Sequence, residues 1–217
     1  MRKLFIFDLD GVIVNSEPLH EHAKKRILSE EGIEEDLDLS WSVGQPSQIL
    51  WETLIRRFGL KRTARELEDL QYAHILEEIR EKRIPTTPGL EELLSHLESQ
   101  GMRIGLASSS DQAYVDAVLE HYRLSGTFRY AIGGDRVPRK KPAPDVYEAV
   151  LAQAKVLASE AVALEDSAAG STAAQAAGIP CIGYINPDSG AQDLSRCIGT
   201  IRHLEDAAAI LEEMDNL

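Results

Sequence analysis

Near its N-terminus the chain runs Leu4-Phe5-Ile6-Phe7-Asp8-Leu9-Asp10-Gly11. A continuous apolar run that stops at acidic residues and a glycine is typical of a strand buried on both faces, and such strands lie in the centre of parallel sheets. Similar runs predict further strands at residues 103–107, 161–164 and 181–184, with a weaker candidate at 130–132. The chain therefore begins with the central strand of a sheet whose other strands come much later in the sequence.

Helical patterns separate these predicted strands. Apolar residues recur at helical spacing over 90–97, 114–119 and 146–151, an alanine-rich run covers 168–177, and a last helix is expected over about 204–214. Strands that alternate with helices in this way predict βαβ units. The expected fold class is therefore α/β, with a Rossmann-like, doubly wound parallel sheet as its core.

Residues 16–83 break this alternation, because they contain helical patterns and no convincing strand. We expect an inserted all-α helical cap domain over residues 16–83. Residues 1–15 and 84–217 would then form the α/β catalytic core. Because the insertion directly follows the first strand, we also expect it to close over a ligand site as a lid.

Composition limits the classes of partner. The 217 residues carry a formal net charge of −13 and suit one α/β core with an inserted subdomain. An acidic chain disfavours nucleic acids and anionic membranes, because their phosphate groups require a basic face. The apolar run at the N-terminus is too short for a signal peptide, and no run reaches membrane-spanning length. We expect a monomeric, cytoplasmic protein with no membrane or nucleic-acid partner.

The cysteines and the first histidines suggest no further site. Cys181 and Cys197 match no metal-ligand pattern, so free thiols are the preferred interpretation and a disulfide is the alternative. His20 and His22 are two residues apart and would point in different directions on a helix, which disfavours a metal pair. For His20 we prefer a surface position over a role in proton transfer.

Polar residues follow several of the predicted strands. In open α/β sheets, ligands bind beyond the carboxyl ends of the strands. The residues at these ends are Asp8, Asp10, Ser108, Glu165 and Asp166. Carboxylates gathered in a small site repel one another unless a hard cation such as Mg²⁺ lies between them. Together with a hydroxyl group and the positive charge of Lys141, such a site suits a phosphoryl group.

Each of these residues also has a structural interpretation. Asp166 could be a helix N-cap, Ser108 and its neighbouring serines could cap the helix that starts near Asp111, and Lys141 could be a solvated loop charge. Against these alternatives, a carboxylate such as Asp8 at the end of a buried strand is costly without a partner. The residues also share one edge of one predicted sheet, which favours a common site.

Four sequence motifs, in order along nearly the whole chain, carry a resemblance to the haloacid dehalogenase superfamily. The matching stretches are Phe7-Asp8-Leu9-Asp10-Gly11-Val12, Leu106-Ala107-Ser108, Lys141-Pro142-Ala143-Pro144-Asp145 and Leu164-Glu165-Asp166-Ser167. Asn15-Ser16-Glu17-Pro18-Leu19-His20 resembles the start of the cap in the β-phosphoglucomutase-like branch, with Asn15 where aspartate is usual. We expect this difference to affect the hinge and not the chemistry.

The resemblance implies roles for the motif residues. Asp8 would attack phosphorus and form an aspartyl phosphate, and Asp10 would act as general acid and base. Ser108, the Ser109 amide and Lys141 would hold the phosphoryl group. The metal ligands would be Asp8, the backbone carbonyl of Asp10, Asp166, and Glu165 directly or through water. A second aspartate at position 10 argues against the dehalogenase members, which as a rule lack it.

The preferred function is a Mg²⁺-dependent phosphatase for a small phosphorylated metabolite, such as a sugar or polyol phosphate. The alternative is a β-phosphoglucomutase-type phosphomutase, in which a cap arginine grips a second phosphate. The matching stretch, Gly44-Gln45-Pro46-Ser47, has no arginine, and Gln45 is instead expected to contact substrate. Arg56, Arg57 or Lys61 could substitute for that arginine. A non-catalytic binding module is disfavoured, because the nucleophile, its partner aspartate, the lysine and the metal ligand are all present.

Overall fold

The computed structural model describes residues 2–35, 37–39, 41 and 47–215 of the chain. The expected substrate contact Gln45 lies outside the described residues. The chain divides into two compact units. We name residues 1–15 with 85–217 the core unit, and residues 16–84 the helical unit.

The core unit contains a six-stranded sheet in the order β3-β2-β1-β4-β5-β6, with every neighbouring pair parallel. The strands are β1 (Leu4–Phe7), β2 (Arg103–Ala107), β3 (Tyr130–Ile132), β4 (Ala161–Glu165), β5 (Cys181–Tyr184) and β6 (Gly199–Ile201). β1 lies between β2 and β4, and all its residues are buried. The prediction of a parallel α/β sheet around the first strand is confirmed.

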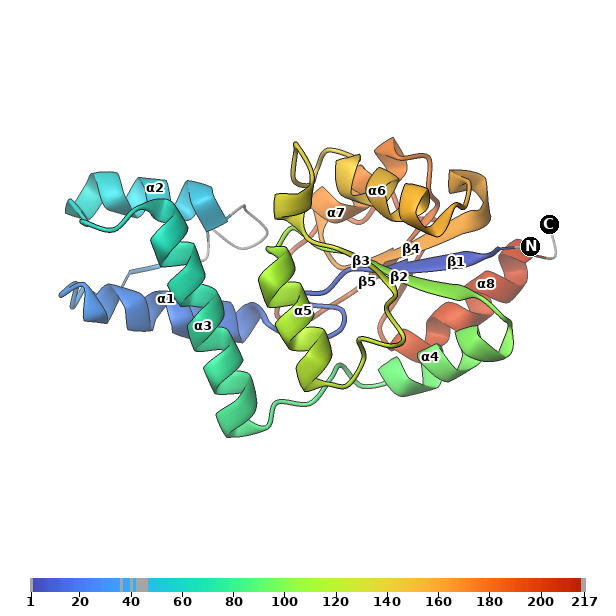
Figure 1. The fold of residues 1–217 in the computed structure, drawn as a ribbon, viewed down its shortest axis with the longest axis horizontal. Helices are drawn as coiled ribbons and strands as arrows, with labels where there is room; N and C mark the ends of the chain where they lie inside the picture. Colours follow the sequence, from blue (N-terminus) through green and yellow to red (C-terminus); the bar gives the residue numbers. More distant parts are fainter. Residues whose placement is uncertain (1, 36, 40, 42–46, 216–217) are drawn as a thin grey trace. The chain divides into compact units, whose positions relative to one another are not determined.

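Helices cover both faces of this sheet, which explains why the central strands are apolar throughout. The helices are α4 (Leu90–Ser99), α5 (Gln112–His121), α6 (Asp145–Ala154), α7 (Ala168–Ala176) and α8 (Ala207–Asp215). In Figure 1, α6 and α7 lie over one face of the sheet, and α4 and α8 lie side by side over the other.

The edge strand β6 was not predicted from the sequence. Of its residues only Ile201 is buried, whereas Thr200 is exposed, so the segment has no apolar run. The last predicted helix also differs at its start, because Leu204–Asp206 forms a 3-10 turn before α8. Both Cys181 and Cys197 are free thiols, as preferred. None of the helices in the described ranges is long and apolar enough to cross a membrane.

The helical unit consists of α1 (Glu17–Glu30), α2 (Ser47–Phe58) and α3 (Ala64–Lys82), and its described residues contain no strand. α3 begins with a capping box, in which the Thr63 hydroxyl group accepts from the Glu66 amide and the Glu66 carboxylate accepts from the Thr63 amide. The apolar side chains that face one another form the unit's core: Ile27, Leu28, Leu37, Leu39, Leu50, Trp51, Leu54 and Leu67.

A chain of neutral hydrogen bonds crosses the interior of the helical unit. Trp51 Nε1 donates to Gln71 Oε1 at 2.9 Å, and Gln71 Nε2 lies 2.7 Å from His20 Nδ1. Since the indole N–H can only donate, it fixes the orientation of the Gln71 amide, whose nitrogen must then donate to His20. The neutral imidazole therefore carries its proton on Nε2.

The surface position preferred for His20 is wrong. Its side chain is buried, because α3 packs along α1 and brings Gln71 to the imidazole ring. His22, in contrast, is exposed, and its Nδ1 lies 2.9 Å from Glu78 Oε1. The two rings have different partners, as expected for residues two apart on a helix.

Candidate active site

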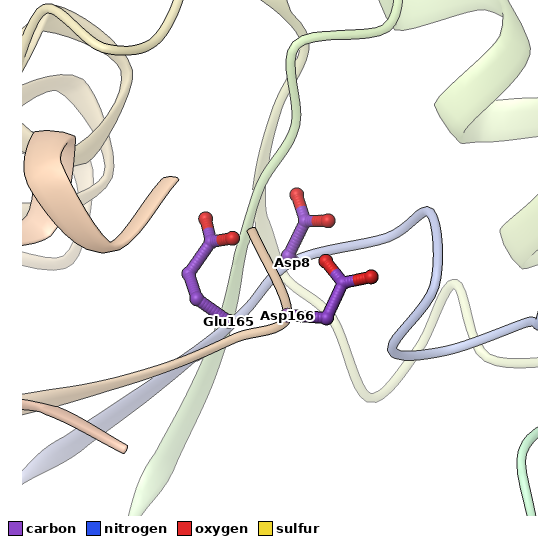
Figure 2. Close-up of side chains that lie close together, drawn as sticks. All are labelled: Asp8, Glu165 and Asp166. Atoms are coloured by element: carbon purple, nitrogen blue, oxygen red, sulfur yellow. The ribbon is translucent and has the colours of Figure 1, made fainter. Parts of the chain in front are cut away.

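Three acidic side chains gather where β1 and β4 end. Asp8 directly follows β1, Glu165 is the last residue of β4, and Asp166 comes next. One carboxylate oxygen from each residue lies within 4.8 Å of the corresponding oxygens of the other two. All three residues are buried. Figure 2 shows the carboxylates of Asp8 and Asp166 extending in a similar direction, with that of Glu165 on the other side of Asp8 in this view. The parallel pairing of β1 with β4 thus brings residues from distant parts of the sequence to one point.

Lys141 joins this cluster from the loop before α6. Its Nζ donates to Asp8 Oδ1 at 2.6 Å, to Glu165 Oε1 at 2.5 Å and to the Ala107 carbonyl oxygen at 2.7 Å. An ammonium group has three N–H donors, so all of them are engaged. The side chain is 4% exposed, which overturns the alternative of a solvated loop charge.

Burial and charge together set the protonation of this group. Burial raises the pKa of Asp8 well above its usual value, and the neighbouring carboxylates add to the rise while Lys141 opposes it. Burial also acts to lower the pKa of Lys141, but the attraction of Asp8 and Glu165 outweighs it and holds this pKa above its usual value. The lysine therefore stays charged, and a further positive charge would favour the ionised form of Asp8.

Two hydroxyl groups hold the Asp10 carboxylate. Ser110 Oγ donates to Asp10 Oδ2 at 2.7 Å, and the Tyr114 hydroxyl group donates to Oδ1 at 3.3 Å. From the sequence, Ser110 is only a possible helix cap, and Tyr114 is expected on the apolar face of a helix. The available signal was the tyrosine itself, since a buried tyrosine hydroxyl usually requires a polar partner.

Ser108 and Ser109 follow β2, and Ser108 does not cap the next helix. The Ser108 hydroxyl oxygen accepts from the Ser110 amide at 2.9 Å, whereas the first amide of α5, that of Gln112, donates to Asp135 Oδ1 at 2.7 Å. Ser108 is buried and Ser109 is half-buried. The capping interpretation is therefore wrong for Ser108.

Asp166 is likewise no helix cap. Ser167 is the N-cap of α7, and its hydroxyl oxygen accepts from the Gly170 amide at 3.0 Å. Asp166 Oδ2 instead accepts from Ser189 Oγ at 2.5 Å. Gly11, with φ of +82°, approaches so closely that an added Cβ would lie 2.0 Å from Asp166 Oδ2. A side chain at position 11 would therefore displace this carboxylate.

The connection after β5 supports the loop that carries Asp10. Asn186 Nδ2 donates to the Gly11 carbonyl oxygen at 3.1 Å and to Asn15 Oδ1 at 3.2 Å. Asn15 Nδ2 in turn donates to Asp188 Oδ2 at 2.6 Å. An aspartate at position 15 would place a second carboxylate against Asp188, which gives a local reason for the asparagine.

The donor set suits a hard divalent cation. Carboxylate oxygens are the ligands that Mg²⁺ takes in proteins, and Asp8 and Asp166 offer them at one point. In the described part of the chain, no other group of three acidic, histidine or cysteine side chains lies this close together. The residues present therefore fit the predicted metal.

Comparison with known proteins gives the family. A family model for haloacid dehalogenase-like hydrolases matches residues 5–184. The chain belongs to this family. It is 30% identical over 215 residues to the phosphorylated carbohydrates phosphatase of Thermotoga maritima, across 95% of this chain and 89% of that protein.

Solved structures share the fold. The CbbY protein of Rhodobacter sphaeroides, solved with phosphate, is 22% identical with a TM-score of 0.85, covering 95% of this chain and 96% of that one. The β-phosphoglucomutase of Clostridium difficile is 22% identical with a TM-score of 0.80, covering 100% and 98%. These two likenesses show the fold alone, whereas the family model and the phosphatase relative identify the chain as a phosphatase-type enzyme of this family.

Proposed function

We propose that this chain is a Mg²⁺-dependent phosphatase that hydrolyses a small phosphorylated metabolite, such as a sugar or polyol phosphate. The observation that carries the proposal is the Asp8 carboxylate. It is buried at the end of the central strand, bonded to Lys141 at 2.6 Å and adjacent to Asp166. An isolated structural carboxylate would not need this combination of an ammonium group and further carboxylates.

In the proposed reaction, an Asp8 oxygen attacks phosphorus, and the bond between phosphorus and the leaving oxygen breaks. Asp10 donates a proton to that oxygen and then takes one from the water that cleaves the aspartyl phosphate. Ser110 and Tyr114 orient Asp10 for both transfers. Ser108, the Ser109 amide and Lys141 would hold the phosphoryl oxygens.

Mg²⁺ would be held by Asp8, Asp166 and the Asp10 backbone carbonyl, and would supply positive charge where negative charge develops on the phosphoryl group. Ser189 orients Asp166 for this purpose through its hydrogen bond to Oδ2. Without a cation, the cluster holds three buried carboxylates against one buried ammonium group. This imbalance supports a divalent cation.

We also propose that the helical unit acts as a cap that admits small substrates and excludes bulk water, with Gln45 as a substrate contact. The connectivity supports this role, since the unit is inserted between the loop that carries Asp10 and helix α4. A phosphomutase remains the alternative. Arg57 pairs with Glu35 at 3.0 Å, but the pair is exposed and would not prevent Arg57 from binding a phosphate. We prefer hydrolysis because the stretch Gly44-Gln45-Pro46-Ser47 has no arginine.

The test is a screen of phosphorylated metabolites with Mg²⁺, scored for free phosphate and for isomerised product. We expect phosphate release that stops in the presence of a chelator and returns with added Mg²⁺. Full activity in the chelator would contradict the metal requirement. Isomerisation of β-glucose 1-phosphate faster than phosphate release would show that the enzyme is a mutase.

A further inference from the structure

The Glu165 carboxylate is surrounded by protein donors. Its Oε1 accepts from Lys141 Nζ at 2.5 Å and from the Tyr147 hydroxyl group at 2.6 Å. Its Oε2 accepts from Ser167 Oγ at 3.1 Å. The residue has no exposed surface. Both Glu165 oxygens therefore have partners from the chain itself.

The backbone leaves a space shaped for this carboxylate. Gly170 lies in the first turn of α7, and a Cβ added there would lie 1.9–2.1 Å from the three atoms of the Glu165 carboxylate group. The glycine thus permits the carboxylate to lie against the helix. This position is compatible with the bonds to Lys141 and Tyr147, and any larger residue would displace it.

Tyr147 is the partner that sequence reasoning left in the apolar core. Its ring is fully buried in the cluster between the sheet and α6, and Lys141 Nζ lies 5.3 Å from the ring centroid. Lys141 stands just before α6 and Tyr147 lies within its first turns, so one segment supplies both donors to Glu165 Oε1. A phenylalanine would fill the same core volume but could not donate this hydrogen bond.

Charge balance separates the two adjacent acids. Glu165 pairs with Lys141 and accepts from two hydroxyl groups, whereas Asp166 accepts from Ser189. The three N–H groups of Lys141 are directed at Asp8, Glu165 and the Ala107 carbonyl oxygen. Asp8 shares Lys141 with Glu165. A divalent cation would therefore chiefly balance the negative charges of Asp8 and Asp166, whereas the charge of Glu165 is balanced by Lys141.

We propose that Tyr147 is a positioning residue for the phosphatase reaction, in which its hydroxyl group holds Glu165 against Lys141 and away from the metal, so that Lys141 stays bonded to Asp8. This inference rests on the proposed function. The sequence led us to expect Glu165 as a metal ligand. We now propose instead that Glu165 holds Lys141 in position. Tyr147 acts through Glu165 and Lys141 and does not touch the reacting atoms.

The test compares Tyr147→Phe with the wild type in two independent measurements. The first is calorimetric binding of Mg²⁺ alone, with Asp166→Asn as the reference for loss of a true ligand. The second is steady-state hydrolysis of p-nitrophenyl phosphate at saturating Mg²⁺. Tyr130→Phe is the matched control, because Tyr130 packs against the same apolar cluster, whereas the partners of Glu165 are Lys141, Tyr147 and Ser167.

We expect Tyr147→Phe to bind Mg²⁺ at least as tightly as the wild type and to lose about tenfold in kcat, the size of one hydrogen bond to a charged group, with KM little changed. Tyr130→Phe should match the wild type in both measurements. Mg²⁺ binding weakened by about tenfold or more in Tyr147→Phe would overturn the proposal, because supports of true metal ligands have effects of that size. An unchanged kcat would overturn it as well.

The two measurements also separate this inference from the proposed function. If the wild type released no phosphate from any phosphomonoester, the proposed function would fail. The calorimetric comparison would still decide whether Tyr147 and Glu165 support the metal. Circular dichroism and the thermal midpoint of each variant show whether it is folded.

Discussion

The core unit and the helical unit bury polar side chains in different ways. The core unit concentrates charge, with Asp8, Glu165 and Asp166 around Lys141. The helical unit contains a row of neutral hydrogen-bonded side chains that runs from Trp51 through Gln71 to His20. It also buries Lys24 and Glu68, but none of its described residues belongs to a group of three metal-ligating side chains.

This contrast shows which kind of buried polar group indicates a reactive site. A neutral network in which every bond is made stabilises and orients a fold. A buried cluster with more carboxylates than cations is costly and is retained where a ligand or metal completes it. On this argument, variants of the core cluster should remove activity, whereas variants of the neutral network should chiefly lower stability.

The largest effect is expected for Asp8→Asn. It keeps the size of the side chain and removes the nucleophile, so phosphate release should fall below detection while the fold is retained. Asp10→Asn should reduce turnover by roughly 10²–10⁴-fold, the usual contribution of general acid–base catalysis. Steady-state assays with the best substrate, together with circular dichroism, check both. Substantial turnover by Asp8→Asn would remove covalent catalysis by this residue from the account.

Lys141→Met should affect both activity and stability. The variant leaves Asp8 and Glu165 without their shared cation. Removing one partner of a buried ion pair costs about 3–5 kcal/mol, and urea unfolding should show a loss of this order. Arg139→Met is a suitable control, because Arg139 also pairs with a carboxylate, that of Asp145 at 2.7 Å, but its own side chain is 69% exposed. Equal losses in the two variants would contradict the importance given to the buried cluster.

Gln71→Leu tests the neutral network. It leaves Trp51 Nε1 and His20 Nδ1 without their shared partner in a buried position. Each buried polar group left unsatisfied costs about 1–3 kcal/mol, which should appear in the free energy of unfolding with kcat largely retained. A loss of kcat well beyond the loss of stability would show instead that the tautomer of His20 matters for the reaction.

The smallest effect concerns Lys24. Burial lowers the pKa of Lys24 from the ordinary lysine value of 10.5, so the unfolded chain binds more protons than the folded chain between the lowered pKa and 10.5. Stability should therefore rise with pH through that window. Lys24→Met should be more stable than the wild type near neutral pH, and the difference should narrow as the pH rises. Thermal unfolding at a series of pH values checks this, and a constant difference would contradict it.

Much of the fold could be predicted because the central strands are covered on both faces and therefore carry uninterrupted apolar runs, as in Leu4–Phe7. The edge strand Gly199–Ile201 lacks that cover, so no such run marks it. Likewise the burial of His20 could not be predicted, because it depends on α3 packing along α1.

The candidate site could likewise be predicted only in part. Its carboxylates and lysine stand in motifs that are local in sequence, and the parallel pairing of the strands brings these motifs together. The residues that hold these carboxylates by hydrogen bonds do not lie in such motifs. Tyr114 meets Asp10, and Ser189 meets Asp166, across long stretches of sequence. Partners of this kind follow only from the packed structure.

We expect Asp8 to carry the phosphoryl group during turnover, and this aspartyl phosphate can be trapped. The enzyme is mixed with an accepted phosphomonoester and Mg²⁺, quenched in acid within one turnover, digested and analysed by mass spectrometry. We predict a phosphoryl group on Asp8 of the wild type and none on the same peptide of Asp8→Asn. A phosphoryl group on another residue, or continued turnover by Asp8→Asn with no modified peptide, would contradict it.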